Sequence, residues 1–170
     1  SLIFAVGLAC PLLVACGSDT PDTTGENGEL RTVNTLRGEI DVPVDPQNVV
    51  AVDWQLPPVL VDLGITPVGI YGGYYEEDAA AARAVPHRYV EELADATRIG
   101  NWDAVDVEKI STLEPDLIVT TGVGLDDAQI DKLAAIAPLA HFSRDDDMES
   151  QRQLADIVNR SEEFSDLRDD

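Results

Sequence analysis

The sequence predicts an α/β fold, with a doubly wound, mostly parallel sheet covered by helices. Short apolar runs, which are typical of buried parallel strands, recur at residues 48–53, 66–70, 116–120 and 139–142. Segments with helical spacing of apolar residues separate these runs, and proline or glycine stands at several of the junctions. Strands that alternate with helices favour a parallel sheet with helices on both faces.

The first half of the chain supplies a hairpin, a strand and a helix before the second strand. A small hairpin is expected over residues 35–44, ahead of the first apolar run. The helix at 56–63 follows that run, and it carries Pro57 and Pro58, which helices tolerate only in their first turn. Gly64 can end this helix, because glycine readily adopts the left-handed conformation that follows a helix.

Helices separate the later strands in the same way. They are expected at residues 76–84, 106–113, 126–136 and 148–158, with a further helix beginning at 161. In the third of these, Ile130, Leu133 and Ile136 form an apolar stripe at helical spacing. Asp126 and Asp127 begin the same helix, where negative charge complements the helix dipole.

Residues 106–122 are the most informative stretch of the chain. Asp106 can cap a helix whose first turn carries Glu108, and Pro115 ends that helix, because the residue before a proline avoids the helical conformation. The apolar run at 117–119 then suits a buried central strand. The resulting pattern, E-x-I-x-x-L-x-P-D-L-I, resembles the signature of the periplasmic-binding family that delivers iron-siderophores, haem and vitamin B12 to ABC importers.

The resemblance covers residues 31–170, because a strand entered through Pro46, the helix after it and the strand at 66–70 follow in family order. It implies the N-terminal lobe of a two-lobed, class III-type substrate-binding protein, with the second lobe absent from this chain. The implied division is a lipoprotein signal segment, a flexible tether, a ligand-binding lobe and the start of the inter-lobe helix, at residues 1–16, 17–30, 31–160 and 161–170.

The resemblance also implies an activity. The chain is expected to be no enzyme but a solute-binding lipoprotein, which captures a ferric siderophore and delivers it to the permease of an ABC importer. Because the ligand is itself a metal chelate, no resident cofactor and no directly ligated metal are expected. Cobalamin and haem are the alternatives within the family. A metalloenzyme-like lobe and a purely structural surface lipoprotein are the alternatives outside it.

The N-terminal segment, residues 1–16, is apolar and carries no charge. It is shorter than the ~20 residues that a spanning helix needs, and Pro11 interrupts it, so it suits a secretory signal. Residues 13–16, Leu-Val-Ala-Cys, resemble a bacterial lipobox, which implies acylation of Cys16 and a lipid anchor on the extracytoplasmic face of the cell membrane. The alternative is an uncleaved anchor helix. Cys10 and Cys16 are the two cysteines of the chain, so the processed domain has neither a disulfide nor a thiol nucleophile.

The balance of charge excludes one class of partner. The sequence carries 33 acidic and 11 basic side chains, which gives a formal net charge of −22. Nucleic-acid binding requires clustered lysine and arginine to neutralise phosphates, so the chain is not expected to bind nucleic acid. The acidity indicates solubility at an extracellular surface or in high salt.

Candidate ligand contacts follow from the rule that open parallel sheets bind ligands beyond the carboxyl ends of their strands. Both tryptophans and three of the four tyrosines fall in the loops that this rule selects, and aromatic side chains suit a large, flat or greasy chelate. The predicted ligand-binding residues are Trp54, Tyr71, Tyr74, Tyr75, Asn101, Trp102, Thr121 and Gly122. Alternatively, one or two of the aromatics belong to the core of the lobe or pack against a second lobe.

The charged residues near these loops add two expectations. Many siderophore binders of the family carry an arginine where this chain has Trp102, which argues against a strongly anionic ligand gripped at that point. Arg83, Arg88 or Arg98 can replace that arginine, although all three also fit a role as surface charges. Glu108 occupies the position that the family uses to dock with arginines of the permease, and it also complements the helix dipole.

The sequence gives little support to a metal or catalytic site. His87 and His141 are too few and too distant in sequence to form the kind of zinc or manganese site that several histidines and a carboxylate build. No G-x-S-x-G, P-loop or G-x-G-x-x-G motif occurs in the chain. No catalytic residue is therefore predicted.

Overall fold

The computed structural model describes residues 28–73, 75, 85–101 and 104–169. Within these residues a five-stranded sheet forms the centre, in the strand order β5-β4-β3-β8-β9. Its strands are β3 (Val49–Ala51), β4 (Gly69–Ile70), β5 (Thr97–Arg98), β8 (Leu117–Thr120) and β9 (Leu139–His141). Every neighbouring pair is parallel, and the order runs outward from β3 in both directions, as in doubly wound folds. The α/β fold class predicted from the sequence is therefore confirmed.

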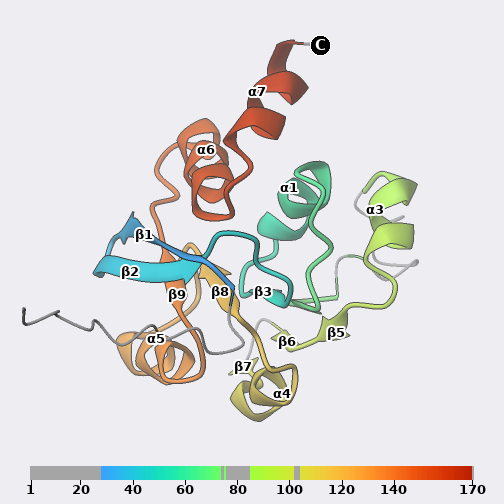
Figure 1. Cartoon of the computed structure of the whole chain (residues 1–170). Coiled ribbons are helices and arrows are strands. Elements are labelled where there is room, and N and C mark those ends of the chain that lie inside the picture. The colour runs from blue at the N-terminus through green and yellow to red at the C-terminus, as the bar shows by residue number, and fades with distance from the viewer. Residues whose placement is uncertain (1–27, 74, 76–84, 102–103, 170) are drawn as a thin grey trace, which may run out of the picture.

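Two antiparallel hairpins and six helices complete the part of the chain that the structure describes (Figure 1). The hairpins are β1 (Leu30–Thr35) with β2 (Gly38–Pro43), and β6 (Gly100–Asn101) with β7 (Ala104–Val105). The helices are α1 (Leu56–Asp62), α3 (His87–Glu92), α4 (Val107–Thr112), α5 (Asp127–Ala134), α6 (Asp147–Ile157) and α7 (Ser161–Asp169).

Helices cover both faces of the sheet (Figure 1). Alternate residues of β3 serve the two faces, because side chains of a strand point to opposite sides in turn. Val49 and Ala51 belong to one apolar cluster, to which α1 and α6 contribute, and Val50 belongs to a second cluster, to which α4 and α5 contribute. All three side chains are fully buried. Burial on both faces explains why this strand is a continuous apolar run rather than an alternating one.

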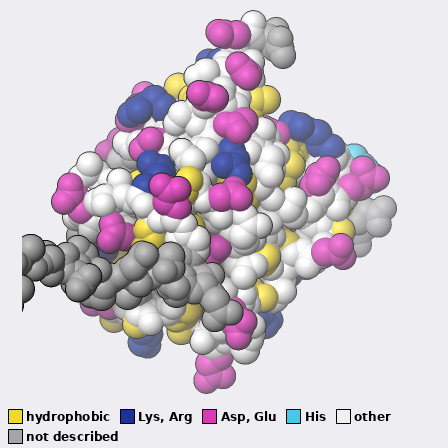
Figure 2. Space-filling view, in the orientation of Figure 1, with side chains coloured by type: hydrophobic (Ala, Val, Ile, Leu, Met, Phe, Trp, Pro, Cys, Tyr) yellow, Lys and Arg dark blue, Asp and Glu magenta, His cyan; other side chains and the backbone are white. Residues whose placement is uncertain are grey.

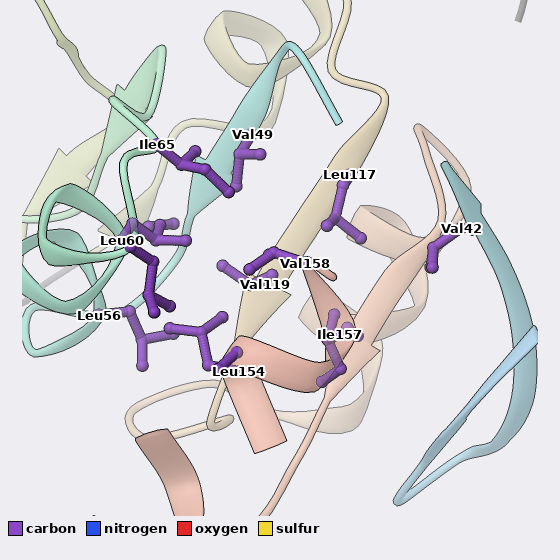
Figure 3. Packing of buried hydrophobic residues seen from close by; sticks show 14 of the residues in the cluster. Val42, Val49, Leu56, Leu60, Ile65, Leu117, Val119, Leu154, Ile157 and Val158 are labelled. Atoms are coloured by element: carbon purple, nitrogen blue, oxygen red, sulfur yellow. The ribbon is translucent and has the colours of Figure 1, made fainter. Parts of the chain in front are cut away.

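The first of these clusters is drawn in Figure 3. Leu56 and Leu60 from α1 and Leu154 and Ile157 from α6 belong to the same cluster as Val119 of β8. Each fully buried leucine or isoleucine of this kind stabilises the fold by about 1.5–3 kcal/mol relative to an exposed one. The packing therefore fixes the two helices that border the candidate site.

Local signals set the helix ends as the sequence predicts. The carboxylate of Asp106 accepts a hydrogen bond from the backbone N–H of Lys109 at 2.9 Å, which caps α4. Asp126 and Gln129 form a reciprocal capping box at the start of α5, with distances of 2.7 and 2.9 Å. Gly64 follows α1 with a φ of +77°, the left-handed conformation expected of it.

Some elements differ from the sequence-based expectations. The hairpin expected at 35–44 is present but begins earlier, because Val33 and Val42 both reach the apolar cluster under α6. The sequence does not predict α3, β5 or the β6–β7 hairpin. Two-residue strands carry no periodic pattern, and α3 buries only Tyr89. The helix expected at 76–84 lies outside the described residues.

The surface carries the acidity of the sequence. Figure 2 shows acidic side chains over many parts of one face, with lysine and arginine side chains among them. Within the described ranges, no helix is long and apolar enough to cross a membrane.

Candidate functional site

The loops that leave the carboxyl ends of β3 and β8 are joined by buried polar contacts. Asp53 is only 2% exposed, and its carboxylate accepts hydrogen bonds from the backbone N–H of Gln55 at 2.8 Å and from the hydroxyl of Thr121. Thr120 is fully buried, and its hydroxyl donates to the carbonyl of Val52 at 2.9 Å. These buried polar groups have the partners that burial requires, so the two loops are held together.

A cavity of about 1000 Å³ opens beside these loops. Residues of α1, α3, α6 and α7 form much of its wall, together with residues of the loops after β3, β8 and β9. Sites for small molecules enclose about 300–1,000 Å³, so the space suits a large ligand. Three of the predicted contacts line it, namely Trp54, Tyr75 and Thr121, and so do Arg88 and Arg144.

Trp54 is fixed from two sides at the cavity wall. Its backbone carbonyl accepts a hydrogen bond of 2.6 Å from the hydroxyl of Tyr75, which is 4% exposed. The guanidinium carbon of Arg144 lies over the indole ring, 5.3 Å from the ring centroid, within the range of a cation–π contact. The indole is half-buried, so one part of it is available to a ligand in the cavity.

Arg88 and Tyr89 of α3 share a carboxylate of α1. Arg88 donates to Asp62 at 2.7 Å, and the hydroxyl of Tyr89 donates to the same carboxylate at 2.8 Å. Burial and the hydrogen bond to Asp62 raise the pKa of Tyr89 above its ordinary value. The charge of Arg88 is therefore largely compensated within the cavity wall.

The other predicted ligand residues are placed differently. Tyr71 is 7% exposed and packs in the apolar cluster on the α4 and α5 side of the sheet, so it is a core residue and does not stand on the rim. Gly122 lies against the imidazole of His141, and Asn101 is exposed on β6. Neither Gly122 nor Asn101 lines the cavity.

Some of the predicted residues lie outside the part of the chain that the structure describes. Tyr74, Trp102 and Cys16 lie outside the described residues, and so does Arg83 among the arginines considered as replacements. Arg98 donates hydrogen bonds to the carbonyls of Leu93 and Ala96, at 3.4 and 3.0 Å. Its guanidinium therefore hydrogen-bonds to the backbone of the segment that connects α3 to β5.

Arg144 is a candidate site residue that the sequence analysis missed. It lies in the loop after β9, at the same carboxyl edge of the sheet as Trp54 and Thr121. The strand-end rule could have selected it, had it been applied to the strand at 139–142 as well.

Glu108 lies in the first turn of α4 and is exposed to solvent. The helix runs back toward the start of β8, so its first turn stands near the carboxyl edge of the sheet. Its accessible carboxylate is compatible with docking, and this role stays a prediction.

Comparisons with known proteins give relatives of one kind, although no protein-family model matches the chain. The chain is 28% identical over 167 residues to YhfQ of Bacillus subtilis, a candidate ABC transporter substrate-binding lipoprotein, and this match covers 96% of the chain and 50% of YhfQ. It is 26% identical to the Fe(3+)-citrate-binding protein YfmC of the same organism, over 92% of the chain and 50% of YfmC. It is 29% identical to the iron(3+)-hydroxamate-binding protein YxeB, also from B. subtilis, over 76% of the chain and 35% of YxeB.

Solved structures agree with these relatives. A periplasmic solute binding protein from Mycobacterium smegmatis is 26% identical with a TM-score of 0.66, and the match covers 82% of this chain and 50% of that one. SirA of Staphylococcus aureus, solved with staphyloferrin B, has a TM-score of 0.69 over 82% of this chain and 46% of its own, and at 24% identity it shows the fold alone. The chain spans about half the length of the first curated relatives it matches. The resemblance predicted from residues 106–122 is confirmed by these relatives.

Proposed function

We propose that this chain is the N-terminal lobe of a lipid-anchored solute-binding protein, which captures a ferric siderophore and delivers it to an ABC importer. The observation that carries the proposal is the cavity of about 1000 Å³ at the carboxyl edge of the parallel sheet, with Trp54 in its wall. Ligands of open parallel sheets bind at this edge. The names of YfmC and YxeB, as binders of Fe(3+)-citrate and iron(3+)-hydroxamate, support the ligand class.

Tryptophan fluorescence tests the proposed ligand class. The full-length protein should lose fluorescence on adding ferric siderophores, because Trp54 lies in the cavity wall. Zinc and manganese ions alone should have little effect. Tight, saturable binding of a bare divalent ion with no response to any chelate would contradict the proposal. Saturable binding of haem or cobalamin alone would replace the ferric siderophore as the ligand.

A second lobe is proposed to complete the site. Closure of two lobes buries most of a ligand's surface, whereas a single wall buries much less. Since each tenfold change in affinity corresponds to about 1.4 kcal/mol, loss of half of the contacts should cost several decades of affinity. Isothermal titration of the 170-residue chain beside the protein of the whole reading frame tests this. Equal affinities would show that the site lies wholly within residues 1–170.

Glu108 is proposed to contact the permease. An exposed carboxylate on the rim can steer and register a basic partner at low cost to the fold. Glu108→Ala should leave chelate affinity nearly intact and reduce growth that depends on transport of the chelate. Lost chelate affinity together with normal association with the permease would assign Glu108 to the cavity or the fold instead.

Cys16 is proposed to carry the lipid anchor. In bacterial cells that express the full-length protein, Cys16→Ala should abolish labelling with a fatty acid and either release the protein or leave an unprocessed precursor. Two or three acyl chains give stable anchoring where one chain gives marginal binding. Unchanged acyl labelling of the variant would rule out Cys16 as the modified residue.

A further inference from the structure

Three of the arginines that the structure describes line the cavity: Arg88, Arg144 and Arg168, of which Arg168 is exposed to solvent on α7. The first two stand in different electrostatic settings. Arg88 donates to Asp62 at 2.7 Å, and the pair is nearly neutral. Arg144, in contrast, has no carboxylate within 4.0 Å of its guanidinium nitrogens among the described residues, and its guanidinium lies over the ring of Trp54. A half-buried guanidinium in cation–π contact with an aromatic ring keeps its full charge available to a third group.

The acidic residues next to Arg144 in the sequence are engaged elsewhere. The hydroxyl of Ser143 donates to the carboxylate of Asp145 at 2.7 Å. The carboxylate of Asp146 accepts the first backbone N–H groups of α6, from Met148 and Glu149, at 2.9 and 3.0 Å. These contacts hold both carboxylates to their own backbone region. Asp147 also lines the cavity but is exposed to solvent, where its charge is screened.

We infer that Arg144, in cation–π contact with Trp54, is an anion-binding subsite that selects ferric chelates with free carboxylates over uncharged chelates. This inference rests on the proposed function and specifies its ligand. The cation–π contact holds the guanidinium at the cavity wall, and a planar guanidinium can donate two parallel hydrogen bonds to one carboxylate. The chain as a whole has a net charge of −22, which disfavours the approach of an anion. A local uncompensated cation in the cavity offsets that repulsion where the ligand binds.

The test uses two iron chelates of opposite character and three variants of the full-length protein. Ferric citrate, prepared with excess citrate, is the anionic carboxylate probe, and ferrichrome is the uncharged hydroxamate probe. Arg144→Gln removes the charge, and Arg144→Lys keeps the charge but loses the planar fork. Arg152→Gln is the matched control, because Arg152 lies outside the cavity lining and pairs with Glu149 on the surface of α6.

Wild-type protein should bind ferric citrate more tightly than ferrichrome in isothermal titration, with an affinity that falls as salt is added. Because Arg144→Gln loses a charge-assisted hydrogen bond, its affinity for ferric citrate should be about tenfold or more lower than that of wild type. This affinity should also depend less on salt concentration. Its affinity for ferrichrome should change by less than about threefold. The affinity of Arg144→Lys for ferric citrate should lie between those of wild type and Arg144→Gln. Arg152→Gln should bind both probes with the affinity of wild type.

The outcomes separate this inference from the proposed function. Wild-type binding of ferrichrome that equals or exceeds that of ferric citrate would overturn the inference and leave the proposed function standing. An equal loss for both chelates in Arg144→Gln, or no loss for either, would also overturn it. Recovery of citrate affinity by Arg144→Lys above that of Arg144→Gln would support a charge effect even if both variants lose some stability. Wild-type protein that binds no ferric chelate at all would overturn both.

Discussion

The loops after β3 and β4 leave the same edge of the sheet, and both carry aromatic side chains. In the loop after β3, Trp54 is half-buried and stands in the cavity wall against Arg144. After β4, Tyr71 is 7% exposed in the core, and Tyr75 is 4% exposed and gives its hydroxyl to the backbone of Trp54. The loop after β3 therefore presents an aromatic ring to the cavity. The two tyrosines after β4 are buried instead, one in the core and one hydrogen-bonded to the backbone of Trp54.

The difference arises from how far each residue stands beyond the hydrogen-bonded ladder. The backbone N–H of Tyr71 still donates to the carbonyl of Ala51 at 3.2 Å, so Tyr71 continues the alternation of β4. Tyr71 therefore points to the same face of the sheet as Gly69, two residues before it. Leu113 lies against Gly69 on this face, and Leu113 packs against the apolar cluster that contains Tyr71. Trp54 comes after the chain has turned at Asp53, so its direction is set by the loop. The position of a residue just after a strand predicts which edge of the sheet it lies at. The direction of its side chain depends on whether its backbone still hydrogen-bonds to the neighbouring strand.

Truncation of the two rings should separate their roles most clearly. Tyr71→Ala should lower the free energy of unfolding by about 3–5 kcal/mol, as expected for a large aromatic removed from a core. Trp54→Ala should lower it by about 1–2 kcal/mol, because the indole is only half-buried, and should reduce chelate binding instead. Urea unfolding followed by circular dichroism measures the first effect, and titration measures the second. Equal destabilisation by the two changes would mean that Trp54 is also a core residue.

The loop after β8 contains two glycines, one packed against a neighbouring side chain and one in open space. Gly122 has a φ of +75°, and an added Cβ would collide with the imidazole of His141. Gly124 has a φ of +79°, and nothing lies within 4 Å of an added Cβ. Gly124→Ala should therefore cost only the backbone strain of about 1 kcal/mol, whereas Gly122→Ala should cost about 2–3 kcal/mol. Thermal unfolding of the pair tests this, and equal losses would show that His141 moves aside freely.

The support that Tyr75 gives to Trp54 should have a smaller effect. Tyr75→Phe keeps the buried ring and removes the hydrogen bond of 2.6 Å to the carbonyl of Trp54, which should cost about 1 kcal/mol. The freed loop should also shift the emission of Trp54 toward that of a more exposed indole. Unchanged stability and unchanged emission would show that this bond does not hold the cavity wall.

The ion pair between Glu149 and Arg152 on the surface of α6 should have the smallest effect on stability of the changes considered. The hydrogen bonds from Arg152 and then Gln153 lower the pKa of Glu149 to about 2, from an ordinary value of 4.5. A carboxyl with a lowered pKa stabilises the fold above its unfolded pKa, and this contribution disappears as pH falls toward the folded value. The small stability difference between wild type and Arg152→Gln should therefore be present at pH 6 and vanish below about pH 2. A difference that grows as the pH falls would contradict the assignment.

Local signals explain which parts of this structure are predictable from the sequence. The caps at Asp106 and Asp126 and the buried strand at 117–120 depend on residues within a few positions of each other, and the structure has them as predicted. The burial of Tyr71 depends on a ladder contact with β3, which is distant in sequence. The cation–π contact between Arg144 and Trp54 joins loops about ninety residues apart, and no single-sequence pattern encodes such a contact.

The bond from Thr121 to the buried carboxylate of Asp53 has a consequence for the thermodynamics of ligand binding. The same carboxylate also holds the backbone of Gln55, so the loops after β3 and β8 form one preorganised unit before any ligand arrives. Binding commonly costs about 0.5–1.5 kcal/mol in conformational entropy for each flexible side chain that becomes ordered. A wall that is already ordered avoids much of this cost. A larger share of the contact energy at Trp54 and Thr121 is then retained as affinity.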